Sequence, residues 1–452
     1  MGPSPPPFAM GTLYAQRVLV ALRAALYKAS GKHWVLYHRD SPESLEMANS
    51  SVVADYLTRG PVTPDHVIRT KGKALVLDPP ADDTAEALSA TVTKAVESFA
   101  ATYTEYFQRQ RTRTGRESVK QLDPLPRVIL ARGVGLITVG ETHGACKIAA
   151  DITEHTITVA KAGASMGSYT PVGEDDLFDM EYWSLEQAKL GKTTPPPLQG
   201  RVVVVTGAAS GIGRATAEAF GRKGAAVFLL DVNGAQLEEA TNALKSAKLA
   251  VGSRVTDVTD EGAVDKALRD CVVLFGGVDI VVSNAGRAIQ SPIDTCSPQT
   301  LRESLEINLV SHQILAAAAS RIFKAQNMGG CLLFNASKAG IAPGPNFGPY
   351  CVAKAATLAL MRQYALELGP LGVRSNAVNA DRVRTGLFTP EVIEQRAAAR
   401  GLDVDTYFKT NLLGREVGAE DVAAAFVHLA LSPATTGAIV PVDGGNIAAV
   451  PR

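Results

Sequence analysis

A run of four valines that leads into a glycine-rich turn places the strongest constraint on the fold of this chain. Residues 202–205 are all valine, and a segment with helical periodicity follows at residues 214–223. The turn between them spaces its glycines as GxxxGxG, from Gly207 to Gly213. Glycines let backbone N–H groups approach a pyrophosphate, and the N-terminus of the following helix favours negative charge. The residues of this predicted phosphate site are Thr206, Gly207, Ser210, Gly211, Ile212 and Gly213.

From residue 201 onward, short apolar strands alternate with segments that have helical periodicity. The expected strands are residues 202–206, 226–231, 253–255, 278–283, 331–335 and 373–378. This alternation is typical of βαβ units, in which helices connect the strands of a parallel sheet. We therefore predict an α/β fold whose C-terminal part, residues 200–452, is a Rossmann-type, doubly wound parallel sheet.

Polar residues at the carboxyl ends of the next strands support a dinucleotide site. Asp231 ends the second strand, where a carboxylate accepts hydrogen bonds from the adenosine ribose and repels the 2′-phosphate of NADP. We therefore predict NAD as the cofactor; the alternative is that Asp231 only caps the next helix. Asp257 follows the third strand and is expected to accept a hydrogen bond from the adenine amino group. The predicted cofactor set also includes Val258, Asn284, Ala285 and Gly286.

Four further polar residues follow in order along the second half of the chain. Asn308 comes first, Ser337 ends an expected strand, and Tyr350 and Lys354 are spaced i, i+4, which puts both on one helix face. A tyrosine has an unperturbed pKa of about 10, and a nearby cation favours its phenolate. An isolated Tyr-x-x-x-Lys pair is more often a surface feature of a helix. We interpret this pair as catalytic because the cofactor residues precede it in register.

Residues 200–447 resemble the short-chain dehydrogenase/reductase family. The matching residues are 206–213, Asp231, Asp257, 284–286, Asn308, Ser337, 350–354 and 443–445. The resemblance implies an NAD-dependent alcohol dehydrogenase in which Tyr350 is the general base for oxidation and the acid for reduction. It also implies that Ser337 binds the substrate oxygen, that Lys354 holds the nicotinamide ribose, and that Asn308 anchors a water. Dimers and tetramers are common in this family, so we expect a homo-oligomer.

The sequence departs from the family after the sixth strand, where many members carry a Pro-Gly turn. Ala380 and Asp381 stand there instead, which places a carboxylate near the cofactor. Thr385 is still expected to reach the nicotinamide carboxamide, and the substrate lid is expected at residues 381–415. These lid residues carry the cations Arg382, Arg384 and Lys409. Such cations either suit an acidic or phosphorylated substrate or face solvent, and the second case is the more common one.

Three consecutive prolines, residues 195–197, separate the two halves of the chain. Proline runs cannot continue a helix and form extended spacers, so we predict domains at 1–194 and 200–452 and a linker at 195–199. The N-terminal half is expected to be a mixed α/β unit. Its expected helices are residues 13–27, 83–107, 142–160 and 177–190, and its expected strands are 32–38, 74–78, 128–130 and 135–139. The basic run at residues 109–113 is interpreted as a solvated, flexible linker rather than a binding patch.

A second resemblance concerns residues 40–195, through the stretches 60–71 and 179–189. They are similar to the rear part of the aldolase module in bifunctional rhamnulose-1-phosphate aldolase/alcohol dehydrogenases. In that family a class II aldolase module binds zinc through histidines in its front part, and the resemblance implies that this chain begins downstream of them. We therefore expect an N-terminally truncated member whose partial aldolase-like domain has no aldol cleavage activity, because its Lewis acid has no site. That domain would pack on the dehydrogenase or mediate assembly.

Composition argues against several other classes of protein. The 45 basic residues balance the 45 acidic ones, so there is no net field to attract nucleic acid or anionic lipid. The five cysteines form no CxxC pair and the seven histidines no HxH or HExxH pair, so we expect reduced thiols and no metal. The first residues do not resemble a signal peptide, and there is no apolar run of about 18 residues. We expect a cytoplasmic protein without a membrane partner.

The leading functional hypothesis is an NAD-dependent oxidoreductase acting on a small hydroxyl or carbonyl substrate, such as lactaldehyde, a polyol or a sugar derivative. Two alternatives stay open. One is a bifunctional aldolase/dehydrogenase of deoxysugar catabolism, which stoichiometric zinc would indicate. The other is an NAD-binding scaffold without turnover, against which the presence of Ser337, Tyr350 and Lys354 argues.

Overall fold

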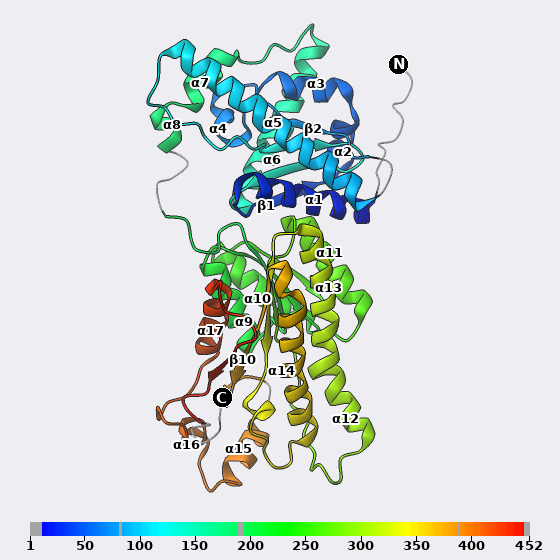
Figure 1. The fold of residues 1–452 in the computed structure, drawn as a ribbon, viewed down its shortest axis with the longest axis vertical. Coiled ribbons are helices and arrows are strands. Elements are labelled where there is room, and N and C mark those ends of the chain that lie inside the picture. Colours follow the sequence, from blue (N-terminus) through cyan, green and yellow to red (C-terminus); the bar gives the residue numbers. More distant parts are fainter. Residues whose placement is uncertain (1–10, 81–83, 189–193, 387–388, 447–452) are drawn as a thin grey trace. The chain divides into compact units, whose positions relative to one another are not determined.

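The computed structural model describes residues 11–80, 84–188, 194–386 and 389–446. The chain divides into two compact units (Figure 1). The first comprises Met1–Gly200 with Val272–Gly277, and the second comprises Arg201–Cys271 with Val278–Arg452. Each unit has its own sheet and its own buried core.

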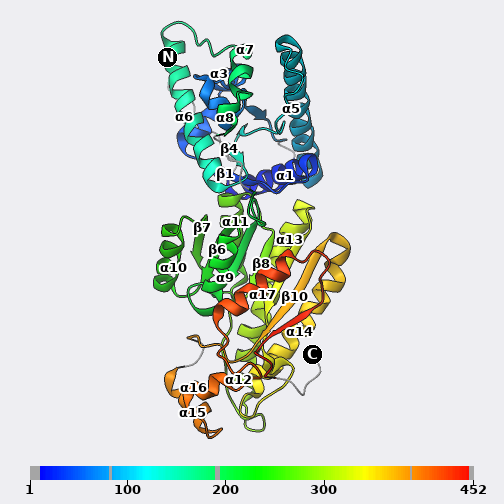
Figure 2. The same cartoon turned by 90° about the vertical axis from the view of Figure 1, so that its left-hand side faces the viewer.

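The N-terminal unit is built on a mixed four-stranded sheet in the order β1-β4-β3-β2. Its strands are β1 (Val35–Arg39), β2 (Leu75–Leu77), β3 (Val128–Ala131) and β4 (Gly135–Gly140). Its helices are α1 (Thr12–Ser30), α2 (Pro42–Asn49), α3 (Ser51–Arg59), α4 (Val67–Thr70), α5 (Ala85–Thr114), α6 (His143–Ser165), α7 (Glu174–Glu181) and α8 (Ser184–Ala188). The helices α5 and α6 lie on opposite sides of the sheet (Figure 2). Every residue of β3 and β4 is buried, so these two strands form the centre of the core.

Two predictions for this unit are wrong. The basic run at residues 109–113 is not a linker, because it continues α5, and its arginines form ion pairs. Arg109 pairs with Glu174 at 2.6 Å, which lies far along the chain and is invisible to local pattern reading. The single helix expected at 177–190 is two helices, α7 and α8, within the described residues. The first helix ends at Glu181, and the hydroxyl of the buried Tyr182 that follows lies 2.8 Å from the hydroxyl of Tyr103.

A buried cluster of charged and polar side chains includes Lys71, in the loop that joins α4 to β2. The Lys71 Nζ lies 3.3 Å from a carboxylate oxygen of Glu181 and 3.9 Å from the ring centroid of Tyr103. The Tyr103 hydroxyl donates to the same carboxylate oxygen at 2.8 Å. Burial lowers the pKa of Lys71 to about 8, against the opposing effect of Glu181.

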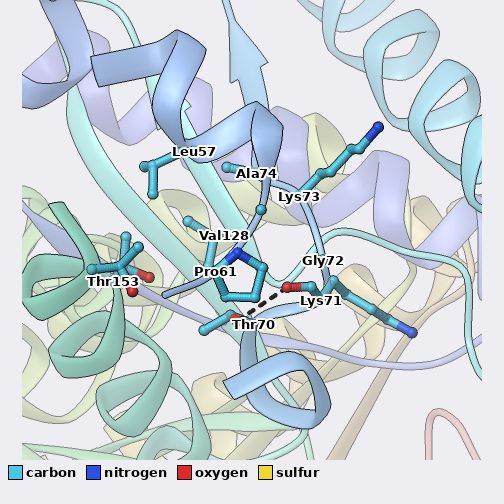
Figure 3. A pocket seen from close by; sticks show the side chains of 11 residues that line it. Leu57, Pro61, Thr70, Lys71, Gly72, Lys73, Ala74, Val128 and Thr153 are labelled. Atoms are coloured by element: carbon cyan, nitrogen blue, oxygen red, sulfur yellow. Dashed lines mark hydrogen bonds between the residues drawn. The ribbon is translucent and has the colours of Figure 1, made fainter. Parts of the chain in front are cut away.

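The backbone at Lys71 has φ 65° and ψ 172°, a conformation that residues other than glycine rarely adopt. Figure 3 shows Lys71 and Lys73 extending to the same side of their loop, away from Leu57 and Thr153, which line a small cavity of about 20 Å³. The surrounding contacts therefore fix an otherwise unfavourable conformation, and the ion pair with Glu181 is one of them.

The second unit contains a parallel seven-stranded sheet in the order β11-β10-β9-β8-β5-β6-β7. Its strands are β5 (Val202–Thr206), β6 (Ala226–Asp231), β7 (Val251–Val255), β8 (Ile280–Ser283), β9 (Gly330–Asn335), β10 (Val373–Ala380) and β11 (Ile439–Val442). The prediction of a doubly wound parallel sheet is confirmed, although β11 was not predicted. The strand order reverses direction between β5 and β8, and ligands of such sheets bind beyond the carboxyl ends of the strands at this point.

Helices connect the strands and cover both faces of this sheet. They are α9 (Gly211–Arg222), α10 (Gly234–Ser246), α11 (Glu261–Phe275), α12 (Pro298–Leu305), α13 (Ser311–Gln326), α14 (Gly348–Leu368), α15 (Pro390–Ala398), α16 (Val404–Lys409) and α17 (Ala419–Leu431). Figure 1 shows α9 and α17 on one side of β10 and α13 and α14 on the other. All five residues of β5 are buried, as a central strand covered on both faces requires.

We expect Glu181→Gln to lower the free energy of unfolding of the N-terminal unit by about 3–5 kcal/mol, because it leaves the Lys71 ammonium buried without its carboxylate. Both tryptophans, Trp34 and Trp183, belong to this unit, so tryptophan fluorescence in a urea titration of the full chain reports its unfolding.

The matched control is Glu46→Gln, which removes the partner of Lys161 from an exposed ion pair of 2.9 Å. That change should cost less than about 1 kcal/mol. Equal losses of unfolding free energy in the two variants would show that the buried ion pair stabilises the unit no more than the exposed one.

Candidate active site

The carboxyl ends of the parallel strands bring the predicted cofactor residues to one cavity of about 770 Å³. The predicted residues that line it are Gly207, Ser210, Gly211, Ile212, Asp231, Asp257, Val258, Asn284, Ala285, Gly286 and Thr385. Two of the remaining ones, Thr206 at the end of β5 and Gly213 in the first turn of α9, are buried and do not line it. The volume falls within the range of sites for organic ligands.

The glycine-rich turn is held by close backbone contacts. Gly207 and Gly211 have φ values of 62° and 50°, and a Cβ on Gly213 would lie 2.0 Å from the carbonyl oxygen of Gly207. Only glycine fits these positions without strain or displacement. The turn thus presents backbone to the cavity at the N-terminus of α9, and this cradle fits a dinucleotide pyrophosphate.

Asp231 supports the turn as well as lining the cavity. Its carboxylate accepts from the backbone N–H of Ala209 at 3.0 Å and from that of Asn233 at 2.9 Å. The residue that caps α10 is Asn233, whose side chain accepts from the backbone N–H of Gln236 at 3.2 Å. The helix-capping alternative for Asp231 is therefore wrong. A carboxylate has about four lone-pair sites, so two remain for a ligand.

The loops after β5 and β8 are joined by hydrogen bonds. The Thr206 Oγ1 accepts from the backbone N–H of Asn284 at 2.9 Å, and the Asn284 side chain donates to the Thr206 carbonyl at 2.9 Å. The Asn335 side chain donates to the Asn284 side chain at 2.8 Å. The other side-chain atom of Asn335, Oδ1, is buried and has no partner among the described residues. Asn335 was not predicted, and it lines both the large cavity and a smaller one.

Asn308 lies in a π-helical turn, Glu306–Val310, between α12 and α13. Its Nδ2 donates to the carbonyl oxygen of Arg287 at 2.9 Å, and its Oδ1 accepts from the backbone N–H of Arg287 at 3.0 Å. Its own carbonyl accepts from the Thr357 hydroxyl of α14 at 2.6 Å. Asn308 therefore ties the loop after β8 to α14, the helix that carries Tyr350 and Lys354.

Ser337 and Tyr350, two of the other three predicted catalytic residues, line the smaller cavity, which measures about 140 Å³. Lys354 is buried and does not belong to its lining. Ser337 follows β9 and forms a hydrogen bond with the buried hydroxyl of Tyr350. The Lys354 Nζ lies 5.8 Å from the Tyr350 ring centroid and donates to the carbonyl of Asn335 at 2.9 Å. The structure thus places the two residues one helical turn apart, as their spacing predicts.

Burial dominates the electrostatics of this cluster. It raises the pKa of Tyr350 to about 12, although the hydrogen bond from Ser337 opposes the rise. It also lowers the pKa of Lys354 to about 7. We expected the nearby cation to favour the phenolate, but in the protein alone burial outweighs that effect.

Asp381 belongs to the Ala380–Asp381 pair that stands where many family members have a Pro-Gly turn, and it contacts two other side chains. Asp381 accepts a hydrogen bond from the Asn446 side chain and lies 3.7 Å from Arg382. It lines the smaller cavity, and its charge raises the pKa of Tyr350 while that of Arg396 lowers it. Local sequence reading missed Asn446 and Arg396 because both come from segments distant from Tyr350 along the chain.

Two negative findings apply to the described residues. No group of three or more His, Cys, Asp or Glu side chains there is placed to hold a metal ion. No helix in the same part of the chain is long and apolar enough to cross a bilayer.

Comparison with protein families gives two matches. Residues 14–190 match the family described as aldolase class II, second domain. Residues 207–446 match the family described as enoyl-(acyl carrier protein) reductase. The first range falls in the N-terminal unit, and the second falls in the second unit apart from Val272–Gly277.

Individual relatives agree with this division. An uncharacterized oxidoreductase of Bacillus subtilis, YuxG, is 32% identical over 96% of this chain, and the chain spans 64% of its length. The 3beta-hydroxysteroid dehydrogenase 1 of Eggerthella lenta is 34% identical over 55% of this chain and 94% of its own. A solved short-chain type dehydrogenase/reductase from Mycobacterium marinum is 27% identical, with a TM-score of 0.51 over 55% of this chain and 96% of its own. With the parallel sheet and the family match over residues 207–446, these findings show that the chain belongs to the short-chain dehydrogenase/reductase family of oxidoreductases.

Proposed function

We propose that this protein is an NAD-dependent oxidoreductase that moves a hydride between nicotinamide and a carbon bearing a hydroxyl or carbonyl oxygen in a small substrate. Lactaldehyde, a polyol or a sugar derivative is the expected class. The observation that carries the proposal is the junction of the two cavities, which share Ile212, Asn335 and Thr385 in their linings. A cofactor bound in the large cavity can therefore reach the smaller one, where Ser337 and Tyr350 lie.

The chain's own residues divide the remaining work. The Tyr350 phenolate takes the proton from the substrate oxygen in oxidation, and the Tyr350 phenol gives its proton to that oxygen in reduction. Ser337 holds the substrate oxygen by a hydrogen bond. Lys354, fixed by the carbonyl of Asn335, supplies a donor beside Tyr350. Bound nicotinamide accepts or supplies the hydride and, when oxidised, adds a positive charge that favours the phenolate. Asn308 positions the backbone of Arg287 at the cavity.

The charges of the large cavity support NAD rather than NADP. Its lining contains four acidic residues, Asp231, Asp257, Glu303 and Glu306, and one basic residue, Arg287. A further phosphate on the adenosine ribose would meet this negative lining, with Asp231 at the end of β6. The small size of the other cavity, about 140 Å³, supports a small substrate.

We expect Tyr350→Phe to lower turnover by about 10²–10⁴-fold, the usual contribution of a general acid or base, while NAD binding persists. NADH formation is measured with NAD and a panel of lactaldehyde, short polyols and sugar phosphates, alongside calorimetric NAD binding. Tyr364→Phe is the control, because Tyr364 is on the same helix and its hydroxyl donates to Gln313 instead. Full turnover in the Tyr350 variant would refute the assigned role.

We expect alcohol oxidation to accelerate with pH, up to about tenfold per pH unit, because the base is a phenolate whose pKa lies near 12 in the protein alone. Reduction uses the protonated phenol and should not accelerate over the same range. Removing the negative charge of Asp381, which raises this pKa, should shift the oxidation profile of Asp381→Asn towards lower pH. A shift to higher pH, or none, in kcat/KM profiles would contradict this electrostatic assignment.

We expect Asp231→Asn to reduce the preference for NAD over NADP by about tenfold or more, because the variant loses the charge that repels the 2′-phosphate. The measurement is kcat/KM for each cofactor with one substrate. Asp265→Asn is the control, since Asp265 pairs with Arg321 outside the cavity lining. An unchanged ratio in the Asp231 variant would show that other residues select the cofactor.

A further inference from the structure

The smaller cavity has a strongly positive lining. Its basic residues are Lys338, Arg382, Arg396 and Arg400, and its one acidic residue is Asp381. The large cavity has the opposite balance, with one basic and four acidic residues. The positive charge is therefore concentrated on the side of the site that holds Tyr350 and Ser337.

Arg396 is the cation whose position relative to Tyr350 is best defined. It projects from α15, and its guanidinium carbon lies 5.0 Å from the ring centroid of Phe347. That ring lies 4.7 Å from the ring of Tyr350. The charge of Arg396 lowers the pKa of Tyr350, so the two groups interact electrostatically.

Three arginines are gathered around one buried ring, that of Tyr407 in α16. The guanidinium carbons of Arg382 and Arg400 lie 4.7 Å and 5.6 Å from its centroid, and Arg396 Nε donates to its hydroxyl at 3.1 Å. Three positive charges around one ring make this side of the cavity attractive to an anion.

Two acidic residues in or next to the lid, Asp405 and Glu416, pair with a different arginine. Arg384, which does not line the smaller cavity, pairs with Glu416 at 2.9 Å and with Asp405 at 3.2 Å. Within the cavity, Asp381 is shared between Arg382 and the side chain of Asn446. The lining of the smaller cavity, which includes Tyr350, therefore has more basic than acidic residues.

We propose that the substrate carries an acidic group, a carboxylate or a phosphate, which binds Arg396 and Arg400 while its hydroxyl faces Tyr350 and Ser337. This inference rests on the proposed function. The planar guanidinium forms paired hydrogen bonds to either kind of anion. The lid cations were expected either to bind an acidic substrate or to face solvent, and the geometry favours substrate binding. The cations concerned are Arg396 and Arg400 rather than Arg384 and Lys409.

The test compares glycerol, glycerate and glycerol phosphate as substrates of the full chain with NAD. They share a small polyol frame and differ in the acidic group, and the two acids distinguish carboxylate from phosphate. We expect kcat/KM for at least one acid to exceed that for glycerol by about tenfold or more, the scale of one charge-assisted hydrogen bond. Equal values for all three would overturn the inference and leave the proposed function standing.

Variants assign the preference to a residue. Arg396→Gln should reduce the acid-to-glycerol ratio of kcat/KM about tenfold, Arg396→Lys should restore part of it, and Arg400→Gln should act in the same direction. The ratio cancels any effect on Tyr350 itself. Arg384→Gln is the matched control and should keep the ratio. Equal loss in Arg384→Gln, or an unchanged ratio in both Arg396→Gln and Arg400→Gln, would overturn the inference.

A binding measurement separates failure of the inference from failure of the proposed function. Glycerate and glycerol phosphate are titrated calorimetrically into the NAD-loaded protein. Binding that weakens about tenfold in Arg396→Gln, without weaker NAD binding, supports the acidic-group site even where no member of the panel is oxidised. Weaker NAD binding in that variant would instead place Arg396 against the cofactor phosphates, and absent binding of both acids together with absent turnover would overturn the inference.

Discussion

The approach of Gly213 to the carbonyl of Gly207 is the contact on which the second unit depends. A Cβ at Gly213 would lie 2.0 Å from that oxygen, so the turn after β5 closes only with glycine. The closed turn brings Ala209 within reach of Asp231 and sets Thr206 beneath Asn284. One backbone contact therefore fixes the ends of three strands, β5, β6 and β8, and the cavity exists because these ends are held together.

The pKa of Tyr350, the proposed proton-transfer residue, is subject to opposing influences. Burial and Asp381 raise its pKa, while Ser337 and Arg396 lower it. A proton-transfer group works best when its pKa lies near the operating pH, so the protein alone leaves Tyr350 too weak an acid. The positive charge of oxidised nicotinamide would lower the pKa of Tyr350. On this account the base is activated only in the complex, which limits unproductive proton exchange in the free enzyme.

Local pattern reading located the parallel sheet and the motif positions because each depends on residues close in sequence: the valine run of β5, the glycine spacing, and the interval from Tyr350 to Lys354. It failed where contacts are distant. Arg109 lies in a helix and pairs with Glu174, which is far from it along the chain. Asn335 and Arg396 come together only once β9 and α15 are folded. Strand β11 was missed because it is four residues long, contains Pro441 and lies at the sheet edge, where proline is tolerated.

The π-helical turn at Glu306–Val310 constrains the number of residues in this segment more than it constrains their identity. Its wider hydrogen-bonding ring accommodates more residues per turn than the α-helix on either side. Each residue of an α-helix rotates the chain by about 100°, so deleting one residue here would turn Asn308 relative to Arg287 or move α13 relative to β9. The segment can exchange many of its side chains, but an insertion or deletion would misalign the helix with the sheet. The number of residues in this turn therefore helps to set the geometry of the candidate active site.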